Sequence, residues 1–278
     1  MLNMKKALPK ILGFIINIIG LLSPKQSAKI AMQLFSTPLK GKTKPHEQKY
    51  LNTAQIENIN YNGLNIKTYT WPGNKDTILL AHGWESNSYR WKDLITHLNK
   101  LQYNVVAIDA PAHGSSQGKT FNAIMNAACI NKIANQIKAT VIIGHSMGGM
   151  STVFALYKTP ISSVKKIILL GAPSNFKGIF NRYTSMMHYS TKVKSAIIKN
   201  IQNTFGQSPE YFSAAEFSKQ LDCKGLIIHD KEDRIIPYQD GLDFKALYKN
   251  GTLITTTGLG HGLKSDVIYN HIISFLKS

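Results

Sequence analysis

Ser146 lies at the centre of a Gly-x-Ser-x-Gly pattern at residues 144–148, and its type and spacing suit nucleophilic chemistry. An apolar segment, 141–143, precedes the pattern, and a helix-compatible segment, 150–157, follows it. On so sharp a strand-to-helix turn, small residues must flank the serine, and its hydroxyl lies near a helix N-terminus that favours negative charge. A free hydroxyl is a weak nucleophile, so this chemistry also requires an adjacent base.

Candidate partners for the serine follow two later apolar segments. His261 comes after the β-branched segment 251–257, and three acids, Asp230, Glu232 and Asp233, come after 226–229. A histidine can take the serine proton while a carboxylate holds its other ring N–H. The residues alone leave the choice among the three acids open, although Asp230 lies close to the expected strand end.

Short, nearly all-apolar segments alternate with helical patterns along the chain. We expect strands at 77–81, 105–108, 141–143, 166–170, 226–229 and 251–257, and helices at 88–101, 121–138, 150–158, 239–249 and 266–277. This alternation predicts an α/β fold with a mainly parallel central sheet and helices on both faces. The motifs that could carry out chemistry come directly after the expected strands. They would therefore lie at the carboxyl edge of the sheet, where the active sites of such folds are found.

From about Asn60 to the C-terminus the chain resembles the α/β-hydrolase superfamily, in particular bacterial serine hydrolases with an N-terminal helical extension. The resemblance rests on residues 144–148, on the loop 82–84, on the Asp-x-x-x-His-Gly-x-Ser pattern at 109–116, and on the segments 229–237 and 258–262. It implies a triad of Ser146 as nucleophile, His261 as base and Asp233, four residues before a proline, as acid.

The same resemblance implies an oxyanion hole made by two backbone N–H groups, those of Met147 and Trp84. His82 and Gly83 are expected to support the loop that carries Trp84. Other polar residues near these motifs are predicted to organise loops or to pack: His82, His113, Asp109 and His145.

The chain is strongly basic, with 33 Lys+Arg against 15 Asp+Glu and a net charge of +18. Residues 1–49 hold nine lysines and one glutamate, and no acid occurs between Asp109 and Glu210. Such an excess of positive charge favours binding to anionic surfaces or substrates. The basic residues carry no recognition motif, so no nucleic-acid partner is expected. A general lysine-rich composition explains the excess equally well.

The two cysteines, Cys129 and Cys223, have no metal-ligand spacing. They are predicted to be reduced thiols in a cytoplasmic protein. The sequence shows no glycine-rich phosphate loop, zinc pattern or dinucleotide fingerprint, so we expect neither a cofactor nor a metal.

Residues 1–50 are predicted to form a helical extension that precedes a hydrolase domain at 51–278. The apolar run 11–22 has twelve residues, too few to span a bilayer. A helix there would place Lys6, Lys10, Gly13, Asn17 and Gly20 on one narrow stripe. Two interpretations stay open: the helix packs under the hydrolase domain, or residues 1–36 lie at a membrane surface, which would make the protein peripheral. Secretion is a third, because the charge order matches a signal peptide, although no cleavage site follows.

A second helix is expected from Pro24 to about Ser36, with Ser23 as its N-cap.

The segment of about 174–222 is long for a connection and rich in aromatic and methionine residues. We expect it to form a helical cap insertion over the serine turn, with side chains suited to an apolar acyl group.

The sequence therefore predicts a serine hydrolase that cleaves small or medium apolar carboxylic esters through an acyl-enzyme. Thioester cleavage or acyl transfer would use the same triad. A ligand-binding or membrane-binding protein that keeps the fold without turnover is the alternative from another class.

Overall fold

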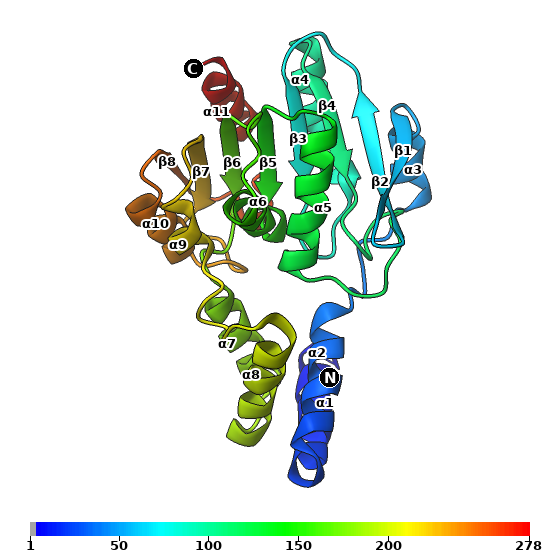
Figure 1. Ribbon diagram of the computed structural model, residues 1–278, viewed down its shortest axis with the longest axis vertical. Helices are drawn as coiled ribbons and strands as arrows, with labels where there is room; N and C mark the ends of the chain where they lie inside the picture. The colour runs from blue at the N-terminus through cyan, green and yellow to red at the C-terminus, as the bar shows by residue number, and fades with distance from the viewer. Residues whose placement is uncertain (1–3) are drawn as a thin grey trace. The chain divides into compact units, whose positions relative to one another are not determined.

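An eight-stranded sheet forms the core of the larger of two compact units in the computed structural model, which describes residues 4–278 (Figure 1). This unit comprises Pro38–Ser174 and Ala214–Ser278. Its strand order is β1-β2-β4-β3-β5-β6-β7-β8. The strands are β1 (Gln55–Tyr61), β2 (Leu64–Trp71), β3 (Thr77–Ala81), β4 (Asn104–Ile108), β5 (Val141–His145), β6 (Lys166–Leu170), β7 (Lys224–Asp230) and β8 (Gly251–Thr256).

Strand β2 pairs antiparallel with both β1 and β4, and the remaining neighbours from β4 to β8 pair parallel. The inner parallel strands are almost wholly buried because both faces of the sheet are covered. Ile78 and Leu80 of β3 face a cluster that includes Leu94 and Ile272. Leu79, between them, is equally buried on the opposite face, as the two-residue period of a strand requires.

The helices of the larger unit lie on both faces of this sheet. One face is covered by α4 (Lys92–Lys100) and α11 (Asp266–Lys277), and the other by α5 (Ala123–Gln136), α6 (Met147–Lys158), α9 (Ala214–Ser218) and α10 (Tyr238–Leu247) (Figure 1). A short α3 (Pro45–Leu51) precedes the sheet, and two single turns, η1 (Ser88–Trp91) and η2 (Gly260–Gly262), complete the unit. The predicted α/β class with a mainly parallel sheet is confirmed.

The smaller unit joins two stretches that are far apart in the sequence, the described part of the chain up to Thr37 and Asn175–Ser213. It contains α1 (Met4–Leu22), α2 (Pro24–Ser36), α7 (Phe176–Met186) and α8 (Thr191–Phe205). Within it, α1 packs against α2 and α8, and α2 packs against α8. The sequence analysis assigns residues 1–50 and about 174–222 to different parts of the chain, whereas the structure packs helices from both into one unit.

Local capping explains where the smaller unit's helices begin and end. Ser23 accepts the backbone N–H of Gln26, which fixes the start of α2 as predicted. Asn175 and Ser190 cap α7 and α8 in the same way, and α8 ends at Phe205, followed by the C-cap Gly206, whose φ is +75°.

No described helix is at once long enough and apolar enough to cross a lipid bilayer.

Candidate active site

The turn at Ser146 has the geometry that the sequence pattern predicts. Strand β5 ends at His145 and α6 begins at Met147, and Ser146 between them has φ 52° and ψ −123°. Positive φ in a non-glycine residue is uncommon, and the surrounding structure must hold it in place. Here the Ser146 N–H donates to the carbonyl of Leu170 at 2.8 Å, and its own carbonyl accepts the N–H of Gly149 at 2.9 Å.

The glycines of this turn are required by close backbone approach. A Cβ at Gly144 would lie 2.6 Å from the backbone nitrogen of Gly149, and one at Gly148 would strike the carbonyl oxygens of Ala81 and His82. Only glycine allows α6 to start this close to the ends of β3 and β5.

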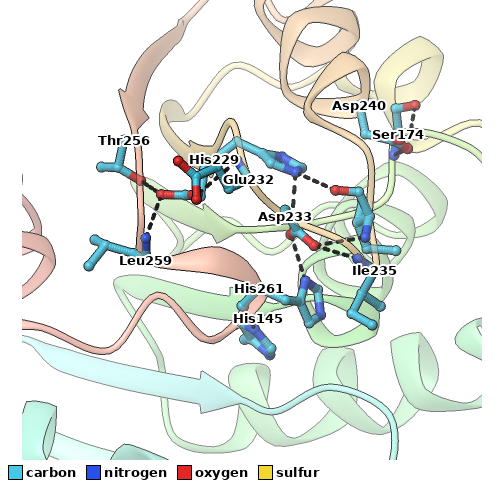
Figure 2. Close-up of polar contacts among 12 residues, drawn as sticks. His145, Ser174, His229, Glu232, Asp233, Ile235, Asp240, Thr256, Leu259 and His261 are labelled. Carbon is cyan, nitrogen blue, oxygen red and sulfur yellow. Dashed lines mark hydrogen bonds and ion pairs between the residues drawn. The ribbon is translucent and has the colours of Figure 1, made fainter.

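His261 and Asp233, 28 residues apart, meet through a hydrogen bond (Figure 2). Nδ1 of His261 lies 2.7 Å from Oδ2 of Asp233, and the other carboxylate oxygen accepts the N–H groups of Ile235 at 2.8 Å and Ile236 at 2.9 Å. The Asp233 side chain is fully buried, whereas that of His261 is 20% exposed. Burial alone would raise the pKa of Asp233, but the hydrogen bonds from His261, Ile236 and Ile235 outweigh it and lower that pKa below its ordinary value.

Asp230, another candidate acid, uses its carboxylate to hold its own loop together. Its Oδ1 accepts the N–H of Glu232 at 2.9 Å, and its Oδ2 accepts the Thr256 hydroxyl at 2.7 Å and the Leu259 N–H at 3.0 Å (Figure 2). The side chain therefore ties the end of β7 to the chain that leads into His261. Its hydrogen-bond partners among the described residues include no histidine, and this geometry favours Asp233 as the acid.

The residue before the serine contacts the candidate base directly. Nε2 of His145 donates to the carbonyl oxygen of His261 at 2.8 Å, and the two imidazole rings lie 4.8 Å apart. Burial, with positive charge from Arg90 nearby, lowers the pKa of His145 well below its ordinary value, so the ring is neutral. His145 thus links the serine turn to the loop that carries His261. Among the described residues, the Ser146 hydroxyl itself makes no hydrogen bond to His261.

Arg90 also holds the His261 loop, since its Nη2 donates to the carbonyl of Gly262 at 3.0 Å. Sequence reasoning gave Arg90 no role in the site, because it lies in a turn that carries no motif.

The loop 82–84 passes directly over the serine. A Cβ at Gly83 would lie 2.8 Å from the Cβ of Ser146. The next residue, Trp84, sets its ring against His113 at 5.3 Å and Phe121 at 5.6 Å. Met147 is the first residue of α6, a position whose N–H has no partner within the helix. These are the two backbone donors that the sequence analysis assigns to an oxyanion hole.

Comparison with known proteins agrees with this architecture. The family model described as the alpha/beta hydrolase fold matches residues 76–224, more than half of the 278 residues. The chain belongs to the α/β-hydrolase family.

Two relatives and one solved structure illustrate the range of this family. The chain is 25% identical to the uncharacterized hydrolase YugF of Bacillus subtilis, over 81% of this chain and 98% of that protein. It is 24% identical to a non-heme chloroperoxidase of Streptomyces lividans, over 78% of this chain and 97% of the relative. An esterase from Exiguobacterium antarcticum superposes with a TM-score of 0.62 at 18% identity, covering 80% and 98% of the two chains. These similarities support hydrolase chemistry in general.

His229 lies at the end of a predicted strand of this α/β-hydrolase, and the sequence alone predicts no further role for it. Its ring is fully buried, and Nε2 donates to the carbonyl of Ile236 at 3.0 Å and lies 3.5 Å from Oδ2 of Asp233 (Figure 2). The histidine therefore holds the loop around the candidate acid. A histidine at the end of an apolar segment, four residues before that acid, is the sequence signal that could have pointed to it.

Hydrogen bonds tie His82 and His113 to the backbone of the loops beside the serine in this hydrolase. Nε2 of His82 accepts the Ala110 N–H at 3.0 Å, and Nε2 of His113 accepts the Glu85 N–H at the same distance. Each ring donates from Nδ1 to a backbone carbonyl. Burial lowers the pKa of each to about 4. Both rings are therefore neutral supports of the loops beside the serine.

Asp109 is the third of these supports. Its buried carboxylate accepts the N–H groups of Ser88 and Ser115 at 2.8 Å and the Tyr69 hydroxyl at 3.1 Å.

Proposed function

We propose that this hydrolase cleaves carboxylic esters through a covalent acyl-enzyme, with Ser146 as nucleophile, His261 as base and Asp233 as the orienting acid. The observation that carries the proposal is the 2.7 Å contact between His261 Nδ1 and Asp233 Oδ2, on a loop hydrogen-bonded to the residue before Ser146. In this arrangement the buried carboxylate fixes the tautomer that leaves Nε2 free to accept a proton.

In the first step, the Ser146 oxygen attacks the ester carbonyl carbon and its proton passes to Nε2 of His261. The resulting oxyanion is held by the backbone N–H groups of Met147 and Trp84, where loss of one donor typically raises the barrier by about 3 kcal/mol. The C–O bond to the alcohol then breaks as His261 returns the proton to the departing oxygen. Water, activated by the same histidine, releases the acid from the serine.

We propose small or medium apolar acyl esters as the substrates. An ester carbonyl is more electrophilic than an amide carbonyl, and its alcohol leaves without the strong protonation that an amine requires. A serine activated by one histidine therefore acts most readily on esters. Thioester cleavage and acyl transfer would use the same three residues and differ only in the leaving group or the acceptor.

Activity-based labelling tests the proposal. The protein is treated with a fluorophosphonate probe, the labelled peptide is mapped, and hydrolysis of p-nitrophenyl esters of increasing acyl length is measured. We expect labelling at Ser146, turnover of short esters, and loss of both in Ser146→Ala with an unchanged melting temperature. Ser151→Ala, which changes a buried serine on the same helix, is the matched control and should behave as the wild type.

Two results would redirect the proposal. A wild-type protein that neither takes the label nor cleaves any ester would refute serine hydrolysis. Faster turnover of acyl thioesters than of the matched oxygen esters, by the same Ser146, would change the substrate class and leave the mechanism intact.

A further inference from the structure

Helix α1 turns its small and polar residues inward and most of its large apolar residues outward, the reverse of an ordinary surface helix. Its inward side is formed by small and polar residues together with Ile16, which is 2% exposed. A Cβ at Gly13 would strike the carbonyl of Met187, and one at Gly20 would lie 2.6 Å from Cγ2 of Val193. The glycines thus let α1 approach the α7–α8 segment closely.

Polar contacts secure the same side of α1. The Asn17 side chain donates to the carbonyl of His188 at 2.9 Å and accepts the N–H of Ser190 at 2.8 Å. Lys192 donates to the carbonyl of Leu21 at 3.1 Å. The helix is therefore held in a defined rotation, with its glycine and asparagine side turned inward.

The outward side of α1 is apolar. Seven large hydrophobic side chains on it are between 47% and 89% exposed: Leu8, Ile11, Phe14, Ile15, Ile18, Leu21 and Leu22. Surface helices normally bury their apolar stripe and expose the polar one. A contiguous apolar face of this kind marks an interaction surface.

The charge of the smaller unit decides between candidate partners for this face. The two stretches 1–37 and 175–213 together contain ten Lys and Arg residues and one acid, Glu210. Lys10 on α1, Lys25 and Lys29 on α2, and Lys192 on α8 are exposed. Two copies of so basic a unit would repel each other, whereas an anionic surface would attract it. Each lysine near anionic headgroups adds to this attraction.

The two unlike sides of α1 favour one mode of binding. Its apolar side is exposed along the whole helix, whereas the side with Gly13, Asn17 and Gly20 packs against the protein. Such a helix suits an orientation parallel to the membrane surface. In that orientation an apolar face sinks into the boundary between headgroups and acyl chains while adjacent lysines contact the headgroups.

We propose that the apolar face of α1 docks the protein on the surface of an anionic lipid bilayer. The attachment is interfacial and reversible, and it combines burial of the α1 side chains with attraction of the surrounding lysines to acidic headgroups. It is independent of the proposed ester hydrolysis, because it uses none of the residues assigned to that reaction.

Flotation of the full-length protein with lipid vesicles tests this proposal. We expect binding to vesicles that contain phosphatidylglycerol, much weaker binding to vesicles of phosphatidylcholine alone, and weakening of the former by added salt. The variant Phe14→Gln/Ile18→Gln should lower vesicle affinity at least tenfold while ester hydrolysis and the circular dichroism spectrum stay unchanged.

A matched control makes the result specific to α1. Ile56→Gln/Val267→Gln removes two exposed apolar side chains elsewhere, on β1 and α11, and should leave vesicle affinity at the wild-type level. A Phe14→Trp variant adds a direct readout, because its fluorescence should shift to the blue when vesicles are added.

Three outcomes would overturn the proposal. One is a wild-type protein that does not bind anionic vesicles. Another is a Phe14→Gln/Ile18→Gln variant that binds them as tightly as the Ile56→Gln/Val267→Gln control does. The third is light scattering that shows a dimer separated by Phe14→Gln/Ile18→Gln, which would assign the face to a second copy of the chain.

Discussion

Asp233 Oδ2 lies 2.7 Å from His261 Nδ1 while Asp233 Oδ1 accepts two backbone N–H groups from Ile235 and Ile236. The two oxygens have separate tasks: one fixes the carboxylate in its loop, and the other fixes the imidazole. This division predicts that the charge at Asp233 matters for turnover far more than for folding.

Asp233→Asn should lower kcat by roughly 10³- to 10⁴-fold, because an amide nitrogen facing Nδ1 favours the wrong imidazole tautomer. Asp230→Asn is the matched control. Asp230 supports its loop through Thr256 and Leu259, so its variant should lose about 1–3 kcal/mol of stability while the folded protein keeps its kcat. Steady-state kinetics and urea denaturation on both variants check this. The opposite pattern would make Asp230 the acid.

His145 is expected to position the base without taking part in proton transfer. His145→Leu removes the donor to the His261 carbonyl and should lower kcat about tenfold with little change in KM, because His261 is then less well oriented. His145→Gln, whose amide can donate to the same carbonyl, should restore most of the activity. If His145→Leu lowers only the melting temperature and leaves kcat unchanged, the residue has a merely structural role.

Most of the framework could be predicted because it depends on local patterns. The sharp turn at Ser146 could be predicted from the glycines around it. The predicted strand 77–81 and the predicted helix 266–277 have the same bounds as β3 and α11. The choice of Asp233 over Asp230 came from a resemblance to a family, since both acids follow the same strand. The hydrogen-bond partners of the two carboxylates, which sequence cannot give, supply the physical argument for that choice.

The contacts between segments distant in the sequence could not be predicted. Asn17 binds the backbone of His188 and Ser190, more than 170 residues away, and nothing in the periodicity of α1 names that partner. The strands expected from the sequence begin at Thr77, so β1 and β2 are missing from them. Strand β1 carries a single buried residue, Ile59, and therefore lacks the alternating burial of a half-buried strand. Residues 64–67 of β2 do alternate between apolar and polar, a signal that could have indicated that strand.

Acid sensitivity should follow in part from His82 and His113, two of the buried histidines beside the site. The pKa of His82 and that of His113 are each about 4 in the folded protein, below the ordinary 6.5, so the unfolded chain binds more protons between these values. The stabilising contribution of each ring is complete above about pH 6.5. It is lost as the pH falls toward 4, by an amount on the order of 3 kcal/mol for each ring.

His113→Gln tests this origin of acid sensitivity, because the amide oxygen can still accept the Glu85 N–H but does not titrate. Urea denaturation at a series of pH values should show a shallower loss of stability between pH 6.5 and 4 than in the wild type. His46→Gln, at an exposed ring, should keep the wild-type slope. An unchanged slope in His113→Gln would show that other groups cause the acid sensitivity.

Exchanging two glycines for alanine, one at a time, distinguishes a steric requirement from helix propensity at the turn around Ser146. In an open helix position, exchanging glycine for alanine stabilises by about 1 kcal/mol. At Gly148 the added methyl would instead strike the carbonyl oxygens of Ala81 and His82, which belong to backbone that can move only with the end of β3. Gly148→Ala should therefore cost at least about 2 kcal/mol and lower activity, because the 82–84 loop over Ser146 must shift.

Gly262→Ala, beside His261, is the control for this prediction, since no atom beyond its chain neighbours lies within 4 Å of the added methyl. It should keep both stability and turnover close to the wild type. Thermal denaturation and ester hydrolysis measured on the pair decide the matter. A Gly148→Ala protein as stable and active as the Gly262→Ala protein would mean that α6 does not need its close approach to β3 to hold Ser146 in place.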